Sequence, residues 1–196
     1  GRAASDGGGH GGGGGGRGGG GGASETAKAR EYNTTPRWCV VVPNVSGQSA
    51  IPLYKGNLRG KQGSIAPGTI VEANFLHARR ADGTEFGEIL NRVGARFINN
   101  GSLKVLMVSG GGKPDFSKYI LIADRGEDGE HVEVKDVLMR TAKITRKANG
   151  SEVLGIRCVG NNGKILITEM DGTYLGYIEE KYAQKSSEAG GRGGDG

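Results

Sequence analysis

The chain has 196 residues, a formal net charge of +5 and 40 glycines, and 35% of its residues are hydrophobic. No stretch approaches the roughly 18 consecutive apolar residues that a membrane-spanning helix needs. The two cysteines, Cys39 and Cys158, lie far apart in the sequence. Two isolated cysteines exclude a disulfide framework and favour a reducing compartment inside the cell.

Both ends of the chain are rich in glycine, and we expect residues 1–36 and 184–196 to be disordered tails. Residues 24–32 contain a serine in a capping position and good helix formers, so they predict a short helix within the first tail. The tail arginines Arg2, Arg17 and Arg192 resemble those of the Gly/Arg-rich segments of RNA-binding proteins, in which arginine contacts phosphate. The alternative is a flexible linker with incidental charge, which the small number of arginines favours.

Five segments of the first half are rich in β-branched and aromatic residues and predict strands, and these are 38–42, 69–74, 85–90, 95–98 and 103–108. Asp82-Gly83 and Asn100-Gly101 are turn dipeptides that favour a positive φ, which suits tight hairpins. The glycine-rich residues 110–114 predict a linker to the second half.

Five further segments predict strands in the second half, and these are 119–123, 132–134, 153–159, 164–169 and 173–178. Asn149-Gly150, Asn162-Gly163 and Asp171-Gly172 predict turns. Residues 134–140 suit either one helical turn or a loop. Many short strands with glycine-containing turns predict an all-β protein with two small antiparallel barrels, one over 37–109 and one over 115–183.

The sequence repeats itself when it is shifted by 82 residues. Residues 68–71 (Gly-Thr-Ile-Val) then fall on 150–153 (Gly-Ser-Glu-Val), Gly94 falls on Gly176, and Trp38 falls on Ile120. The match predicts two copies of one unit. A unit of about 70 residues is near the size at which a single hydrophobic core gives only marginal stability. We therefore expect the two copies to pack against each other and stabilise each other.

Residues 148–156, 163–167 and 171–182, the last of which ends in the closing segment 176–182 (Gly-Tyr-Ile-Glu-Glu-Lys-Tyr), resemble the bacterial-type Src-homology-three domain. That family shows a Gly-Thr-x-Val-x-Val strand and a closing Gly-Tyr/Trp-Val-x-x-x-Tyr-Leu. The first copy resembles it more loosely, through residues 66–73 and 94–98. The resemblance implies tandem barrels that bind ligands. The family's Gly-Trp, whose aromatic residue often lines the ligand groove, is replaced by Lys164-Ile165 here and by Glu85-Phe86 in the first copy.

Basic residues gather around the long loop that follows the second apolar segment of the first copy and around the next hairpin. With one aromatic residue they form the candidate partner groove, whose members are Tyr54, Lys55, Arg59, Lys61, Arg79 and Arg80. Such a rim suits a nucleic-acid phosphate or an acidic protein. The alternative is a solvated loop with ordinary surface charge. Tyr54 and Tyr182 are the aromatics that we expect to be exposed.

The residues that carry most enzyme chemistry are sparse and scattered. The three histidines lie far apart, none neighbours a cysteine, and no metal-ligand spacing occurs, so we expect no catalytic residue, metal or cofactor. Three functions stay open. The first is a non-catalytic module that binds protein or peptide, within a larger assembly. The others are an RNA- or DNA-binding protein that uses the tails and the basic first barrel, and a cell-wall or glycan attachment module.

Overall fold

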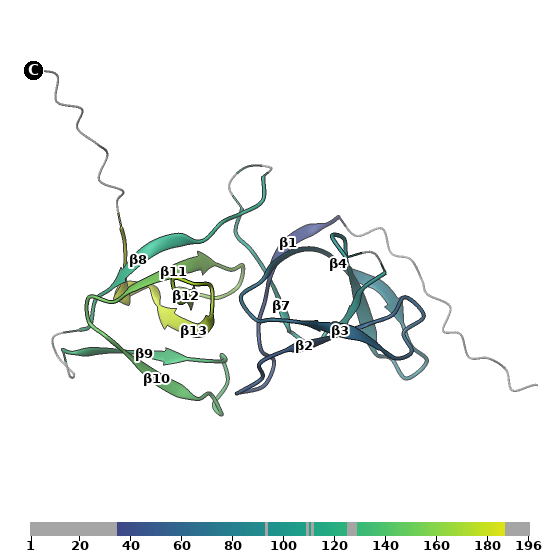
Figure 1. The fold of residues 1–196 in the computed structure, drawn as a ribbon, viewed down its shortest axis with the longest axis horizontal. Coiled ribbons are helices and arrows are strands. Elements are labelled where there is room, and N and C mark those ends of the chain that lie inside the picture. The colour runs from purple at the N-terminus through teal and green to yellow at the C-terminus, as the bar shows by residue number, and fades with distance from the viewer. Residues whose placement is uncertain (1–34, 93, 109, 111, 125–128, 187–196) are drawn as a thin grey trace, which may run out of the picture.

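The computed structural model describes residues 35–186 apart from 93, 109, 111 and 125–128, and in this part of the chain about half of the residues lie in strands and almost none in helices. The strands form two antiparallel sheets that lie side by side (Figure 1). The all-β class expected from the sequence is therefore confirmed. The tail arginines Arg2, Arg17 and Arg192 and the helix predicted at 24–32 lie outside the described residues.

Each sheet contains seven of the described strands. The first sheet consists of β1 (Arg37–Val41), β2 (Ile51–Tyr54), β3 (Lys61–Ile65), β4 (Ile70–Arg79), β5 (Glu85–Ile89), β6 (Arg96–Ile98) and β7 (Leu103–Val105). The second consists of β8 (Ser117–Leu121), β9 (His131–Lys135), β10 (Ile144–Ala148), β11 (Glu152–Arg157), β12 (Lys164–Thr168), β13 (Tyr174–Glu179) and β14 (Ala183–Lys185), with the 3-10 helix η1 (Glu180–Tyr182) before its last strand.

The two sheets share one topology. The first has the strand order β3-β2-β6-β5-β4-β1-β7, and the second has β10-β9-β13-β12-β11-β8-β14, so each strand of one has a counterpart seven strands later. The backbone of the turn before the fourth strand repeats as well. Gly68 N donates to Val41 O and Val41 N to Thr69 O, while Gly150 N donates to Leu121 O and Leu121 N to Ser151 O.

These hydrogen bonds correct the register predicted for the repeat. Gly150 corresponds to Gly68, as the shift of 82 residues predicts, but Leu121 corresponds to Val41, a shift of 80. Trp38 therefore does not correspond to Ile120. The cause is an insertion, because the loop 136–143 between β9 and β10 is two residues longer than the loop 55–60 between β2 and β3.

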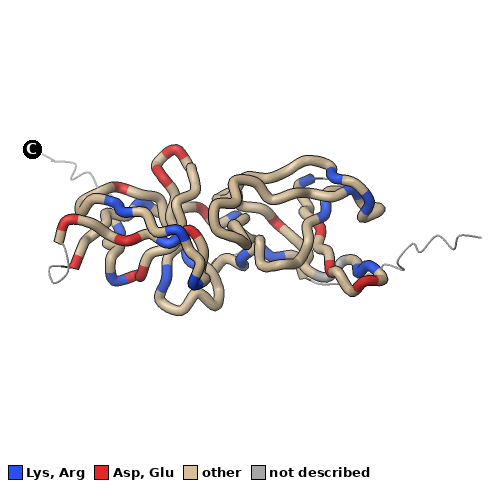
Figure 2. Tube along the Cα trace, turned by 90° about the horizontal axis from the view of Figure 1, so that it is seen from below, with Lys and Arg blue, Asp and Glu red and all other residues tan. Residues whose placement is uncertain are grey.

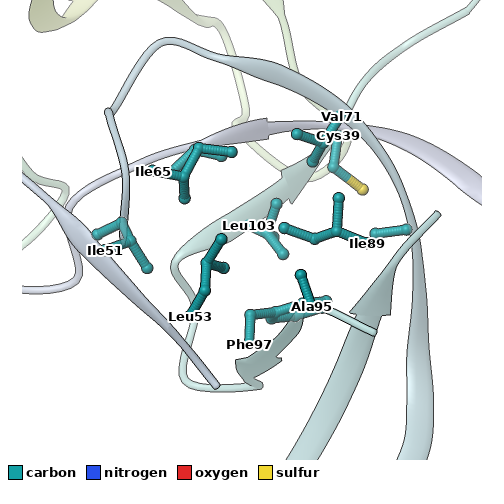
Figure 3. Close-up of a cluster of buried hydrophobic side chains, with 11 residues drawn as sticks. Cys39, Ile51, Leu53, Ile65, Val71, Ile89, Ala95, Phe97 and Leu103 are labelled. Carbon is teal, nitrogen blue, oxygen red and sulfur yellow. The ribbon is translucent and has the colours of Figure 1, made fainter. Parts of the chain in front are cut away.

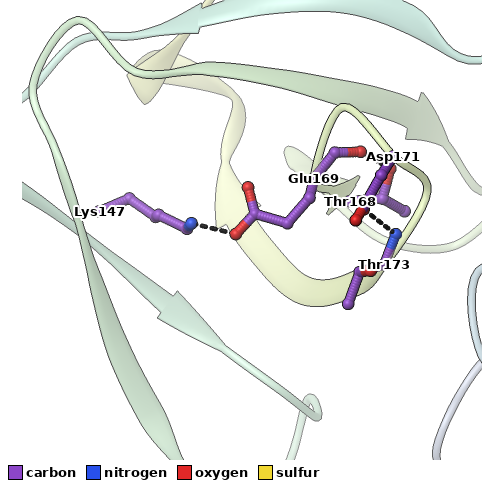
Figure 4. A network of polar contacts seen from close by, with 5 residues as sticks. All are labelled: Lys147, Thr168, Glu169, Asp171 and Thr173. Carbon is purple, nitrogen blue, oxygen red and sulfur yellow. Dashed lines mark hydrogen bonds and ion pairs between the residues drawn. The ribbon is translucent and has the colours of Figure 1, made fainter.

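Both sheets curl around their own apolar cores. In the first core, Ile65 of the edge strand β3 packs in one cluster with Leu103 of the opposite edge strand β7, around the fully buried Phe97 (Figure 3). In the second sheet, an ion pair joins Lys147 of β10 to Glu169, which follows β12. Glu169 lies next to the turn in which Asp171 Oδ1 accepts a hydrogen bond from Thr173 N at 2.9 Å (Figure 4). Among the described residues no strand pairing closes either sheet into a complete ring.

The two sheets meet in a direct junction. Leu106, just after β7, forms a backbone bridge with Cys158, just after β11, in which Met107 N donates to Arg157 O at 3.1 Å and Val159 N donates to Val105 O at 2.8 Å. An apolar cluster covers this bridge, and its buried members are Val40, Val42, Leu106, Ile156, Cys158, Leu166 and Tyr177. Trp38 packs partly buried against this cluster.

Strands β2, β3, β10 and β14 were not among the strands predicted from the sequence. Strand β2 contains Pro52, which cannot donate to a ladder, and β3 is an edge strand whose residues are exposed except for Ile65. Strand β14 runs to Lys185, two residues past the expected end of the second barrel. Polar edge strands carry little of the alternation on which a sequence prediction depends.

The close packing of β5 on β6 yields a test of the first core. A Cβ added at Gly87 would lie 2.2 Å from the Phe97 ring and 2.4 Å from Asn74 O, whereas at Gly112 it would meet nothing within 4 Å. We expect Gly87→Ala to lower the free energy of unfolding by about 1–3 kcal/mol, the usual effect of overpacking. Gly112→Ala is the control and should unfold like wild type in urea. Equal midpoints for the two variants would contradict the packing described.

Candidate functional site

The structure brings the loop 55–60 and the hairpin after β4 together. The Arg80 guanidinium donates to the carbonyl oxygen of Leu58 and lies 4.9 Å from the centroid of the Phe86 ring. Leu58 and Phe86 are buried. The space between loop and hairpin is therefore filled by side chains, and Arg80 is engaged in holding the two segments together.

Two other residues of the predicted groove also have structural contacts. Tyr54 is half-buried and packs edge-to-face on Phe86, with ring centroids 5.6 Å apart. Arg79 is exposed and forms an ion pair with Glu85. Tyr54 thus belongs to the small apolar cluster of Leu58, Ala78 and Phe86, while Arg79 pairs with Glu85 at the surface.

The remaining three residues, Lys55, Arg59 and Lys61, are exposed, and no ion pair joins them to another described residue. Figure 2 shows several Lys and Arg positions at the end of the first sheet that points away from the second sheet. Residues 35–108 contain nine Lys or Arg and four Asp or Glu, so this part of the chain is basic. The structure therefore places these three cations on the solvent side of the loop.

A hollow of about 290 Å³ opens in the second sheet, where β9 and β13 diverge. These strands pair only at Tyr177 and Lys135, while β9 stays paired to β10, and β13 to β12. The hollow is lined by residues of β9, β13 and η1 and of the segments beside them, and these are Asp124, His131, Val132, Glu133, Lys135, Leu138, Lys164, Tyr177, Ile178, Glu179, Lys181 and Tyr182. We call it the β9–β13 pocket.

The pocket lining contains three lysines, three carboxylates and several apolar side chains. Lys181 Nζ lies 3.3 Å from Glu179 Oε2 and 4.6 Å from the centroid of the Tyr182 ring. The pKa of Lys181 is raised, first by its interaction with Tyr182 and then by Glu179, so this lysine stays charged. Lys135 and Lys164 have no ion pair with a described residue. These two lysines are the cations that the pocket offers to a ligand.

The matching place in the first sheet is occupied. Strands β2 and β6 also pair at a single position, Tyr54 with Arg96. In the orientation that satisfies its amide, the Gln62 side chain donates to Tyr54 O at 3.3 Å and to Gly94 O at 3.2 Å. A side chain thus bridges the gap that stands open between β9 and β13.

The loop 136–143, which contributes Leu138 to the pocket, is anchored on the first sheet. Asp136 Oδ2 accepts Ser46 Oγ at 2.7 Å and Gly47 N at 2.9 Å, and its Oδ1 accepts Lys143 N at 2.7 Å. The Tyr174 hydroxyl donates to Asp136 O at 2.6 Å. Burial raises the pKa of the Asp136 carboxyl, but the hydrogen bonds that it accepts outweigh burial, and the pKa lies below its usual value.

The β9–β13 pocket lies in the second copy, whereas the candidate partner groove predicted from the sequence lies in the first, yet the sequence contains a signal for the pocket. The closing segment 176–182, which carries the family resemblance, supplies much of the pocket lining. Tyr182, one of the two aromatics expected to be exposed, is half-buried at the pocket edge. The lysines gave no signal, because Lys135 and Lys164 are 29 residues apart and only the fold brings them together.

The described cysteines do not suit nucleophilic chemistry. Burial raises the pKa of the Cys39 thiol and of the Cys158 thiol to about 12, so both stay protonated near neutral pH. No group of three or more potential metal ligands occurs among the described residues.

Comparison with protein-family models, with curated proteins and with solved structures finds no match to this chain. Within the described residues, no helix has the length and apolar character required to cross a membrane. The function is therefore inferred from the pocket, the basic loop and the junction between the sheets.

The anchor at Asp136 predicts a pH-dependent stability. Its lowered pKa stabilises the fold above the unfolded-state value near 3.9, and this contribution is lost as the pH falls through the lower folded-state pKa. We expect Asp136→Asn to lower the free energy of unfolding by about 1–2 kcal/mol at pH 7, because charge-assisted hydrogen bonds are weakened. The difference from wild type should shrink below about pH 4.

Urea unfolding across this pH range checks the result. Glu130→Gln is the control, since it removes an exposed carboxylate without an inter-sheet hydrogen bond among the described residues. A loss for Asp136→Asn that is the same at pH 7 and at pH 3, or no loss at all, would contradict the anchor.

Proposed function

We propose that the protein is a non-catalytic interaction module, built from two Src-homology-three-like barrels, that binds an extended peptide segment of a partner protein in the β9–β13 pocket. The observation that carries this proposal is the divergence of two adjacent strands around a hollow of about 290 Å³. The barrel assignment is supported by the shared strand order, by the curl of each sheet around its core, and by the position of η1 before the last strand.

A peptide suits this pocket because strands form its walls. The side of β9 that faces β13 has a strand partner only at Lys135, so no described strand pairs with its other backbone groups on that side. An added strand gains affinity from main-chain hydrogen bonds and specificity from alternate side chains. The pairing of β9 with β10 and of β13 with β12 holds both walls in place before binding.

The side chains of the pocket indicate the chemistry of the peptide. Glu179 pairs with Lys181, and Glu133 pairs with Arg146. Lys135 and Lys164 beside Asp124 therefore leave an excess positive charge that favours a carboxylate. Leu138 and the buried Tyr177 offer an apolar surface. The best ligand is therefore an extended segment with an acidic residue next to a large apolar residue. A larger hollow of about 780 Å³ lies beside the connection between the sheets, but the connection itself, with Gly112, Lys113 and Pro114, forms part of its wall. The β9–β13 pocket has walls held by strand pairing.

Nucleic-acid binding is the second candidate, and the exposed cations Lys55, Arg59 and Lys61 favour it. Phosphate contacts of this kind need no defined pocket and make the affinity strongly salt-dependent. Tyr54, the predicted stacking residue, is packed on Phe86. The peptide proposal has the more complete site.

Selection of a phage-displayed library of random 12-residue peptides on the full chain tests the proposal. Selected peptides should contain acidic and large apolar residues. Their affinity, measured by fluorescence anisotropy on synthetic copies, should fall about tenfold in the double variant Lys135→Ala, Lys164→Ala, because each partly exposed charge pair contributes up to about 1 kcal/mol. The matched control Lys113→Ala, Lys185→Ala removes the same charge away from the pocket and should bind like wild type.

Two outcomes would contradict the proposal. One is a library that yields no specific peptide. The other is an equal loss in both double variants, which would show a response to net charge alone. A parallel salt series with fluorescent single-stranded RNA tests the second candidate, for which the affinity should fall steeply with salt and should weaken in Arg59→Ala, Lys61→Ala.

A further inference from the structure

We infer that the peptide-binding site continues from the β9–β13 pocket into the crevice between the two sheets. Both units would then bind one acidic, apolar-rich segment of a partner protein. The inference rests on the proposed function of the β9–β13 pocket. It adds a second contact region on the first sheet and makes the junction between the sheets part of the binding site.

The crevice is a separate hollow of about 200 Å³. One wall of the crevice comes from the first sheet and its loops, and its residues are Val42, Pro43, Asn44, Asn100, Gly101 and Lys104. The other wall comes from the second sheet and its loop, and its residues are Val137, Leu138, Met139 and Tyr177. Leu138 and Tyr177 also line the β9–β13 pocket. The two hollows therefore adjoin at Leu138 and the buried Tyr177, which line both.

Both walls of the crevice are held in place. Two residues from Leu138, the Asp136 carboxylate accepts hydrogen bonds from Ser46 and Gly47 of the first sheet's loop. On the opposite wall, Asn100 Oδ1 accepts Ser102 Oγ at 2.6 Å, and Val42 N donates to Ser102 O at 2.8 Å. A crevice with fixed walls is preorganised, which lowers the entropy that a ligand loses on binding.

The surface around the crevice is apolar and uncovered. Leu138 is 41% exposed, Met139 48% and Val45 53%. Exposed apolar side chains that gather at one place, with a polar rim, mark sites of protein interaction. Here the rim contains the amides of Asn44 and Asn100.

The charged side chains of the crevice and the pocket indicate the chemistry of the ligand. Lys104 lies in the crevice, and Lys135 and Lys164 lie in the adjoining pocket, so lysines occur along the full path. No ion pair with a described residue neutralises any of these three lysines. A segment with acidic residues at both ends and large apolar residues between them complements this path. The chain's own residues 187–196 do not, because they contain no apolar residue larger than alanine.

The peptides selected on the full chain also test this inference. The crevice variant Lys104→Ala, Met139→Ala should bind them about tenfold more weakly than wild type. The matched control Lys118→Ala, Met170→Ala removes one lysine and one methionine, the latter also 48% exposed, away from both hollows and should bind normally. Urea midpoints equal to wild type for both variants show that folding is unchanged.

Stepwise shortening of the peptide sharpens the test. Removal of the residues at one end should weaken binding to wild type and abolish the effect of the crevice variant, while the effect of Lys135→Ala, Lys164→Ala persists. If the crevice variant binds full-length peptides like wild type and the Lys135, Lys164 variant does not, the inference is overturned and the proposed function stands. If neither variant affects binding, the proposed function fails as well. Self-association of the chain that the crevice variant removes would place a second copy in the crevice and would also overturn the inference.

Discussion

The backbone bridge between Leu106 and Cys158 is the constraint on which the arrangement of the molecule depends. Two hydrogen bonds join the end of β7 to the end of β11, one from Met107 N and one from Val159 N. Each is worth only about 1 kcal/mol net. The apolar cluster around Leu106, Ile156 and Leu166 supplies most of the stabilisation, but apolar packing is not directional. The hydrogen bonds fix the register in which the two apolar faces meet.

The two units share one topology, but only the second holds a pocket between its second and sixth strands. In the first unit, Leu58 from the short loop 55–60 packs with Phe86 under Arg80, and Gln62 bridges β2 and β6. In the second unit, the counterpart loop 136–143 is two residues longer and turns toward the first sheet, where Asp136 accepts hydrogen bonds from Ser46 and Gly47. The β9–β13 pocket thus stays open, and the same loop closes the junction.

Local signals in the sequence identified much of the fold. The apolar strands β1, β5 and β12 and the turn glycines Gly83 and Gly150, both at positive φ, follow from composition and from turn chemistry. The edge strands β3, β10 and β14 were missed because most of their side chains are exposed, which removes the alternation of apolar and polar residues. The register error at Trp38 has a similar origin, since an ungapped comparison cannot detect a two-residue insertion in a polar loop.

The site was less predictable, for a physical reason. Basic residues that are close in sequence, such as Arg79 and Arg80, differ in role because one pairs with Glu85 and the other packs on Phe86. The lysines that face the pocket come from different strands and become neighbours only through the curl of the sheet. The crevice depends on both units at once, and no property of either half alone indicates it.

Amide hydrogen exchange at Met107 and Val159, followed by nuclear magnetic resonance on the full chain, tests most directly the claim that the two sheets form one body. These amides donate across the junction, so they should exchange as slowly as the amide of Val41, which donates within the first unit. Exchange as fast as that of the exposed Gly112 amide would contradict the account, because the sheets would then separate freely and neither the junction nor the crevice would persist.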